Sequence, residues 1–284
     1  MKPGDRVIHP QQPDWGVGEI LPDSAGDKLR VYFAYAGEKV LKNAPLQPVS
    51  GEKAQHPLLD HRKSKGSRKG IVRKTIPEAI AEFRAIFPHG FSDPKYFEHE
   101  RDYKLNAHNL MRELLGPEQL AELVAAGDFE ETVTRAQRIV NATNLIFPNE
   151  KMALRDGLNS SEGQRRRFMQ CLNQLLYGTS AEELRFKSWS ELLFDLDAPK
   201  WTNATYFQFL AHPDRRIFLK PTVTQDAADV CNFELNYRPE LNWLTYRSVQ
   251  RFAEILRSEI APLQPRDMID VQSFIWCIAP GKYD

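Results

Sequence analysis

Cysteine is scarce in this sequence of 284 residues, and the residues that usually bind metals are scattered. The three cysteines, Cys171, Cys231 and Cys277, lie far apart and lack C-x-x-C or Cys–His spacing, so they predict neither a disulfide framework nor a zinc site. The seven histidines form no pair at metal-ligand spacing. We therefore expect no metal and no other cofactor, and reduced, mostly buried thiols.

Several motifs of catalysis and targeting are also missing. The chain has no G-x-x-x-x-G-K-[ST], no strand-led G-x-G-x-x-G and no G-x-S-x-G, which argues against nucleotide hydrolysis and against a serine nucleophile. No apolar run approaches the roughly 18 to 20 residues of a membrane span, and no signal-peptide core follows Met1. The sequence thus predicts a cytoplasmic protein that does not bind membranes.

A net charge of zero conceals an uneven distribution of cations. Between residues 61 and 74 the chain has glycine, serine and basic residues, little to bury and no carboxylate, which predicts a flexible, solvated segment. We interpret residues 51–74 as a basic linker between a domain at 1–50 and a domain at 75–284. The cations of this linker are Arg62, Lys63, Lys65, Arg68, Lys69, Arg73 and Lys74.

Residues 4–20 read G-D-R-V-I-H-P-Q-Q-P-D-W-G-V-G-E-I. The turn pair Gly4-Asp5 precedes a short β-prone run, and a polar loop between two prolines leads to Trp15 and a Gly-x-Gly bend. Further strand signals occupy residues 28–35, 38–41 and 46–49. Strands this short and this closely spaced are typical of a small, highly curved barrel.

G-D-x-V-x-H-P followed by W-G-x-G-x-I resembles the opening of the Tudor-like or SH3-like barrels of bacterial transcription and repair proteins. Similar barrels are the RNA-polymerase-interacting domain of CarD and of the transcription-repair coupling factor, and the C-terminal Tudor-like module of UvrD-type helicases. The strongest similarity is to a small uncharacterised family with P-D-W-G-x-G. The resemblance covers about the first fifty residues and implies a barrel that binds protein, typically RNA polymerase, or nucleic acid. The insertion at residues 11–14 departs from the CarD-type pattern and weakens transfer of single polymerase contacts.

Aromatic residues of the barrel are candidate contacts for a protein partner. We expect Val7, Val31, Phe33 and Val40 to fill the small interior. Successive side chains of a strand point to opposite faces, so Tyr32 and Tyr35 are hard to bury together. Trp15, in a loop closed by Pro13 and Gly16, is the leading candidate anchor, because aromatic residues often dominate small interfaces. The alternative is that Trp15 folds back and caps the barrel. The predicted partner-binding residues are Trp15, Tyr32 and Tyr35.

From Thr75 onward the hydrophobic periodicity becomes helical. A capping box with proline in the first turn begins a helix at Thr75, and further helices are expected at about 103–115, 117–126, 130–141, 150–158, 161–176, 180–196, 241–260 and 268–278. Residues 216–221 read as a short strand ended by proline. The fold class is therefore α+β, with a small N-terminal barrel joined to a mainly α-helical domain that resembles no family we can name.

Basic residues are the candidates for nucleic-acid contact. The seven linker cations suit non-specific attraction to phosphates, although a tether that touches nothing is an equal alternative. Arg165 and Arg166, within an arginine triplet, are further candidates, and so are Arg215, Arg216 and Lys220. Consecutive helical residues point in different directions, so pairing with acidic neighbours is the alternative for the triplet. Trp189, Trp201, Trp243 and Trp276 are interpreted as core residues.

Residues 99–104, H-E-R-D-Y-K, are the most reactive-looking cluster. Two carboxylates and a lysine are the residues of a metal-dependent nuclease, but such sites normally lie on a strand, and the favoured interpretation is a solvated first turn of a helix with local ion pairs. Residues 150–154, E-K-M-A-L, and 270–276, D-V-Q-S-F-I-W, are distinctive motifs without an evident mechanism.

The sequence favours a non-enzymatic interaction protein of bacterial-type transcription or DNA maintenance. In this interpretation the barrel docks a protein such as RNA polymerase and the linker attracts nucleic acid. One alternative is an enzyme, above all a metal-dependent nuclease with its site in the helical domain, and no catalytic residue is assigned. Another is a structural adaptor that does not bind nucleic acid.

Overall fold

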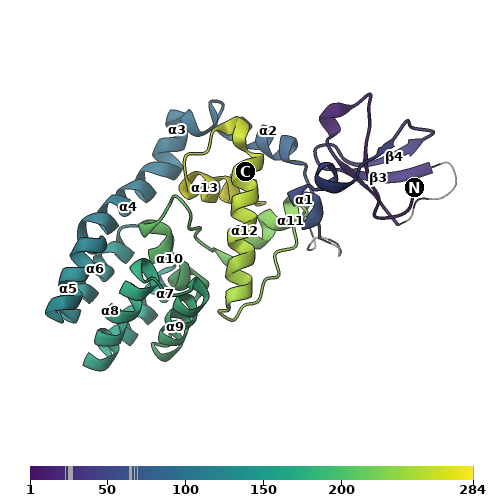
Figure 1. The fold of residues 1–284 in the computed structure, drawn as a ribbon. Helices are drawn as coiled ribbons and strands as arrows, with labels where there is room; N and C mark the ends of the chain where they lie inside the picture. Colours follow the sequence, from purple (N-terminus) through teal and green to yellow (C-terminus); the bar gives the residue numbers. More distant parts are fainter. Residues whose placement is uncertain (23, 25–27, 64–65, 67, 69, 284) are drawn as a thin grey trace.

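The computed structural model describes residues 1–22, 24, 28–63, 66, 68 and 70–283. It has a small antiparallel β-sheet domain at the N-terminus and a larger region built mainly of α-helices, which confirms the α+β class (Figure 1). No helix in the described ranges combines the length and the apolar content needed to cross a bilayer.

The N-terminal domain is a five-stranded antiparallel sheet in the order β4-β3-β2-β1-β5. Its short strands curve around a small core formed by Val7, Ile20, Val31, Phe33 and Leu46, as expected for a barrel-like domain. Gly18 allows this packing, because a Cβ there would lie 2.7 Å from Val31 Cγ1. The strands are β1 (Arg6–Ile8), β2 (Gly18–Ile20), β3 (Lys28–Phe33), β4 (Gly37–Lys42) and β5 (Gln47–Pro48).

The prediction that Val40 lies inside the barrel was wrong. Val31, which is fully buried, pairs with Lys39 across the β3–β4 ladder, whereas Val40 pairs with Arg30. Paired residues of antiparallel strands project to the same face of the sheet, so Val40 points outward and is 62% exposed. Leu46, in the turn before β5, belongs to the core instead.

Residues 51–74 were predicted to be solvated and flexible. The described part of this segment contains short helical turns and buried side chains. It contains a 3₁₀ turn, η2 (Gly51–Ala54), and a short helix, α1 (Pro57–Asp60). Leu58 is buried and belongs to the core of the helical region. Arg62 forms an isolated β-bridge with Phe233. Lys65 and Lys69 lie outside the described residues.

The helical region follows most of the predicted boundaries. Both hydrogen bonds of the predicted capping box are present at Thr75 and Glu78. The helices are α2 (Ile76–Ile86), α3 (Pro94–Tyr96), the π-helical turn η4 (Phe97–Arg101), α4 (Asp102–Leu115), α5 (Pro117–Ala126), α6 (Phe129–Asn141), α7 (Pro148–Asn159), α8 (Glu162–Tyr177), α9 (Glu182–Asp195), α10 (Trp201–Ala211), α11 (Pro221–Val230), α12 (Trp243–Glu259) and α13 (Met268–Ile278). Short 3₁₀ turns are η1 (Pro13–Trp15), η3 (Gly90–Ser92) and η5 (Ala261–Leu263).

Among the longer helices, α10 and α11 were not predicted, and neither were the short α3 and the turn η4. From Trp201 to Leu210 the side chains of α10 are all buried, so the sequence there has no amphipathic period to detect. The strand predicted at 216–221 is absent: residues 216–220 form no regular element, and Pro221 begins α11 instead of ending a strand. Proline suits this position because the first helical residue needs no N–H donor.

Figure 1 shows the helices α4, α5, α6, α8 and α9 at the end of the molecule far from the barrel, and α2, α11, α12 and α13 nearer to it. One continuous hydrophobic core runs through these helices. Trp189 and Trp201 are buried in it, as predicted, whereas Trp243 and Trp276 are only half-buried at its edge.

A buried ionic network joins η4 to α13. Asp270 is fully buried, and it accepts hydrogen bonds from Tyr96 Oη at 2.6 Å, Arg101 Nη1 at 2.7 Å and Arg266 Nε at 2.8 Å. Arg101 also forms an ion pair with Asp267 at 2.7 Å. The buried polar groups of Asp270, Tyr96 and Arg101 thereby find hydrogen-bond partners within this network.

Residues 99–104 were predicted to form a solvated first turn with local ion pairs; a local ion pair is present between Glu100 and Lys104, but Glu100, Arg101 and Lys104 are buried. Lys104 is 1% exposed and donates to Glu100 Oε2 at 2.9 Å and to Ser273 Oγ at 2.8 Å. Burial opposes the charge of Lys104, but Glu100 outweighs it and raises the lysine pKa above its ordinary value. The other oxygen of Glu100 accepts from Tyr283. This cluster holds the C-terminal segment against η4 and α4.

We expect Asp270→Ala to destabilise the protein by about 3 to 5 kcal/mol, because Arg101 and Arg266 lose a buried acceptor. Urea denaturation followed by circular dichroism measures the change. Asp156→Ala is the control, since Asp156 pairs with Arg155 at the exposed surface and should change stability by about 0.5 kcal/mol or less. A loss below about 1 kcal/mol in Asp270→Ala would contradict this role.

Candidate functional site

Four of the described linker cations that were predicted to bind nucleic acid are paired with carboxylates: Arg62, Lys63, Arg68 and Lys74. Arg62 binds Glu19 of the barrel at 2.5 Å, and Lys63 binds Asp229 of α11. Arg68 reaches Asp226 at 2.6 Å and Asp229 at 3.0 Å. These pairs neutralise the linker locally and tie it to α11.

The last two linker cations, Arg73 and Lys74, also interact with groups of the same chain. Lys74 forms an ion pair with Glu82 at 2.6 Å. The charge of Arg73 acts on the Tyr32 phenol, which places Arg73 near the barrel. A phosphate would therefore compete with partners inside the protein at most of these positions.

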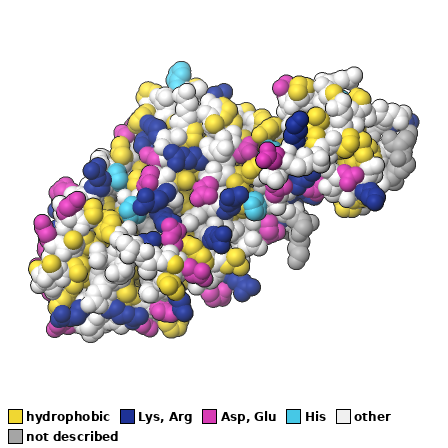
Figure 2. Space-filling view, viewed as in Figure 1, with side chains coloured by type: hydrophobic (Ala, Val, Ile, Leu, Met, Phe, Trp, Pro, Cys, Tyr) yellow, Lys and Arg dark blue, Asp and Glu magenta, His cyan; other side chains and the backbone are white. Residues whose placement is uncertain are grey.

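The three arginines of the α8 triplet pair with acidic neighbours, which was the alternative to phosphate contact. Arg165 pairs with Glu130 at 2.7 Å, Arg166 pairs with Glu162 at 2.9 Å, and Arg167 pairs with Asp195. Figure 2 shows the same pattern on the face in view, where Lys and Arg lie among Asp and Glu.

Trp15 lies against the barrel core. Its ring centroid is 5.0 Å from that of Phe33 and 5.1 Å from that of His9, and Lys39 Nζ lies 5.8 Å from it. The side chain is half-buried. In this arrangement Trp15 packs against the barrel core and keeps part of its surface exposed.

Tyr32 and Tyr35 face the rest of the same chain. Arg62 lies over the Tyr32 ring, 5.7 Å from its centroid. Tyr35 Oη is 3.2 Å from His56 Nε2, which is 3.9 Å from Glu259 Oε1 on α12. Burial raises the pKa of Tyr35 to about 12 and that of Glu259 above its usual range, and it lowers the pKa of His56. Barrel, linker and helical region meet at this contact.

A second group of basic and aromatic side chains lies on the helical region, starting with α7. Lys151 and Arg155 are four residues apart and form one row on a face of α7, and Phe147 precedes this helix as its N-cap residue. Phe147 is 53% exposed. Lys151 Nζ donates to the carbonyl of Thr143 at 2.5 Å.

The row continues onto α11, α13 and the C-terminal segment. Lys220 Nζ lies 4.8 Å from the centroid of Phe147 and 4.9 Å from that of Trp276. Lys282 Nζ lies 5.4 Å from the Trp276 centroid. We call this continuous set the cationic strip; its members are Phe147, Lys151, Arg155, Lys220, Trp276 and Lys282.

The lysines of the cationic strip differ from the paired cations elsewhere. Among the described residues no carboxylate lies within ion-pair distance of Lys151, Lys220 or Lys282. Burial lowers the pKa of Lys151. Burial, followed by the charge of Lys282, lowers the pKa of Lys220 by more than the charge of Glu150 raises it. An anion at this position would relieve the repulsion between the two ammonium groups.

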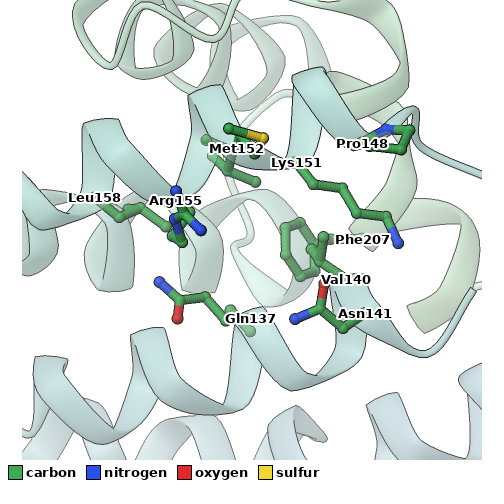
Figure 3. Close-up of a pocket in the computed structure, with 11 residues that line it drawn as sticks. Gln137, Val140, Asn141, Pro148, Lys151, Met152, Arg155, Leu158 and Phe207 are labelled. Atoms are coloured by element: carbon green, nitrogen blue, oxygen red, sulfur yellow. The ribbon is translucent and has the colours of Figure 1, made fainter.

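A cavity of about 250 Å³ opens at the α7 end of the cationic strip, between α6 and α7 (Figure 3). Val140, Leu158 and Phe207 give it an apolar floor, and the amides of Gln137 and Asn141 lie along its α6 side. Lys151, Met152 and Arg155 project from α7. No carboxylate is among its lining residues, so the cavity is electrostatically suited to neutral or anionic groups.

Residues 1–47 match a protein family described as a protein of unknown function, DUF3553. This match covers the barrel domain and agrees with the short antiparallel strands seen there. No curated protein and no solved structure matches the chain. Within the described ranges, no three or more His, Cys, Asp or Glu side chains are grouped so that they could hold a metal ion.

Sequence reasoning missed the cationic strip although it noted most of its parts. Lys220 was considered for phosphate contact, Lys151 belongs to the motif at 150–154, and Trp276 ends the motif at 270–276. The four-residue spacing of Phe147, Lys151 and Arg155 was a local signal. Nothing local indicates that Lys220 reaches Phe147, because packing alone brings these segments together.

The Tyr35–His56–Glu259 contact predicts a pH dependence of stability. The lowered pKa of folded His56 means that the unfolded chain takes up the proton more readily, so its contribution is present above about pH 6.5 and is lost as pH falls below it. Tyr35, Asp60, Arg6 and Glu259 surround this imidazole. Between about pH 7.5 and 5.5 we expect the wild type to lose more unfolding free energy than His56→Gln.

Urea denaturation at both pH values measures this difference, and His99→Gln, at an exposed position, serves as the matched control. An equal loss in wild type and His56→Gln would show instead that the ion pair with Glu259 compensates for the buried proton.

Proposed function

We propose that this protein is a non-enzymatic interaction protein that binds single-stranded nucleic acid along the cationic strip. The observation that supports this is the alternation of lysines lacking a carboxylate partner with the aromatic rings of Phe147 and Trp276. Single strands are held by cations that follow the phosphates and by aromatic rings on which bases stack.

The exposed ring of Phe147 is the stacking position in this proposal. Lys151 and Arg155 continue along α7, Lys220 lies over the Phe147 ring, and Lys282 lies over the ring of Trp276. A phosphate next to a base stacked on Phe147 would thus meet an ammonium group. A duplex is less suitable, because its bases do not expose their faces to a side chain.

The proposal places nucleic-acid contact on the helical region instead of the linker. Most described linker cations already bind carboxylates, whereas Lys220 and Lys282 do not. Replacing an internal ion pair by a phosphate contact yields less free energy than adding a partner to an unpaired lysine. The linker would then add only weak attraction.

Only the resemblance of residues 4–20 to known barrels supports a role for this domain beside RNA polymerase or a DNA-maintenance protein. Tyr32 and Tyr35 face the chain itself, so a protein partner would contact the outward face of β3 and β4, near exposed Val40. Surface plasmon resonance between the full chain and purified RNA polymerase tests this docking. Binding that Val40→Lys abolishes supports it, and no binding leaves only the nucleic-acid role.

We expect Phe147→Ala to weaken binding of a fluorescent single-stranded oligonucleotide by about 1 to 3 kcal/mol, the usual contribution of one base stacked on one ring. Replacing Lys151, Lys220 and Lys282 by Gln should lower the slope of log K against log salt by about two, since each phosphate contact of a single strand adds about 0.7. Fluorescence anisotropy over a salt series measures both effects.

The matched control replaces Arg165, Arg166 and Arg167 by Gln, which removes the same charge from cations that are paired. Its salt slope should stay close to that of the wild type. Equal losses in the two triple variants, or no binding by the wild type, would refute the cationic strip as the site. Cleavage of the oligonucleotide on addition of Mg²⁺ would favour the nuclease alternative.

A further inference from the structure

A groove of about 690 Å³ separates α9 from the segment that leads into α12. It lies on helices that contribute nothing to the cationic strip. Its apolar lining consists of Phe186, Phe194, Pro199, Pro239, Leu241 and Trp243.

The wall of this groove is built from aromatic rings that pack against one another. Phe186 stacks on Tyr246 with ring centroids 4.7 Å apart, and Trp243 packs against both rings at 5.9 and 6.0 Å. Phe186 and Tyr246 are buried. In contrast, Phe194 is 73% exposed, the highest exposure among the large apolar side chains described. An aromatic wall beside an exposed phenylalanine is typical of a surface that receives an apolar side chain.

The charged residues of the groove are mainly acidic. Glu183, Glu191 and Glu240 line it, against the single cation Lys187, whose Nζ lies 4.0 Å from Glu191. Three carboxylates and one ammonium leave two negative charges around an apolar floor. Such a rim attracts Lys and Arg and repels nucleic acid and anionic lipid.

We propose that this groove binds a segment of a partner protein that inserts one aromatic or aliphatic side chain and carries Lys or Arg beside it. The apolar floor supplies affinity, and the carboxylates choose basic flanks over acidic ones. The described part of the chain's own basic linker does not occupy this groove, because its Lys63 and Arg68 bind Asp229 of α11. This proposal is independent of the nucleic-acid role.

The test is selection of random twelve-residue peptides displayed on phage against the full-length protein. We expect enriched peptides that contain an aromatic residue or leucine flanked by Lys or Arg. No enrichment, or enrichment of acidic or wholly polar peptides, would overturn the proposal. The most enriched peptide is then synthesised with a fluorescent label and titrated with the variants below.

Phe194→Ser should weaken binding of that peptide at least about tenfold, as expected for loss of a central apolar contact. Leu184→Ser is the matched control, because Leu184 lies on the same helix, is 59% exposed and does not line the groove. Both side chains are exposed, so both variants should fold, which thermal unfolding checks. Equal affinity for Phe194→Ser and Leu184→Ser would overturn the proposal.

The double variant Glu191→Gln and Glu240→Gln tests the choice of basic flanks. Binding should weaken about two- to tenfold at low salt, and the difference from wild type should shrink as salt screens the rim. Glu118→Gln with Glu122→Gln on α5 removes the same charge away from the groove and should leave binding unchanged. Equal effects of the two double variants would contradict recognition by the rim.

Discussion

The buried carboxylate of Asp270 is the constraint on which the helical region depends. A fully buried charge is tolerated only where donors surround it, and here Tyr96, Arg101 and Arg266 supply them. These donors come from α3, from the π-helical turn η4 and from the residues before α13. Asp270 thereby fixes α13 against segments far away in the sequence, and α13 carries Trp276 to the cationic strip.

Electrostatic pairing also explains how the two parts of the chain are joined. The linker is strongly basic in sequence, but Asp226 and Asp229 of α11 and Glu19 of the barrel pair with Arg62, Lys63 and Arg68. Leu58 adds burial to these pairs. The connection between barrel and helical region is thus largely polar, which is why its strength should respond to the protonation of His56.

The surfaces that remain differ in charge and in the chemistry that they can recognise. The cationic strip combines lysines and aromatic rings and suits a polyanion with planar groups. The groove beside α9 combines a similar aromatic character with acidic residues and suits a basic peptide. Because the two surfaces carry opposite charges, a ligand that binds one of them would bind the other poorly. Such an arrangement is suited to a protein that brings a nucleic acid and a protein partner together.

The sequence by itself determined the class of the fold and most helix boundaries, because those depend on residues within a few positions of one another. The capping box at Thr75, the alternation of short strands and the helical periodicity after the linker are all local signals. They failed at α10, which is buried on every side, and at Val40, whose orientation depends on the register with β3.

The candidate sites were decided by tertiary structure. Arg101 and Asp270 are 169 positions apart, and Lys220 meets Phe147 and Trp276 only after three segments have packed together. Whether a lysine is paired or available depends on which carboxylates folding brings near it. Composition counts the charges of a chain, but only the folded structure determines which of them are already neutralised.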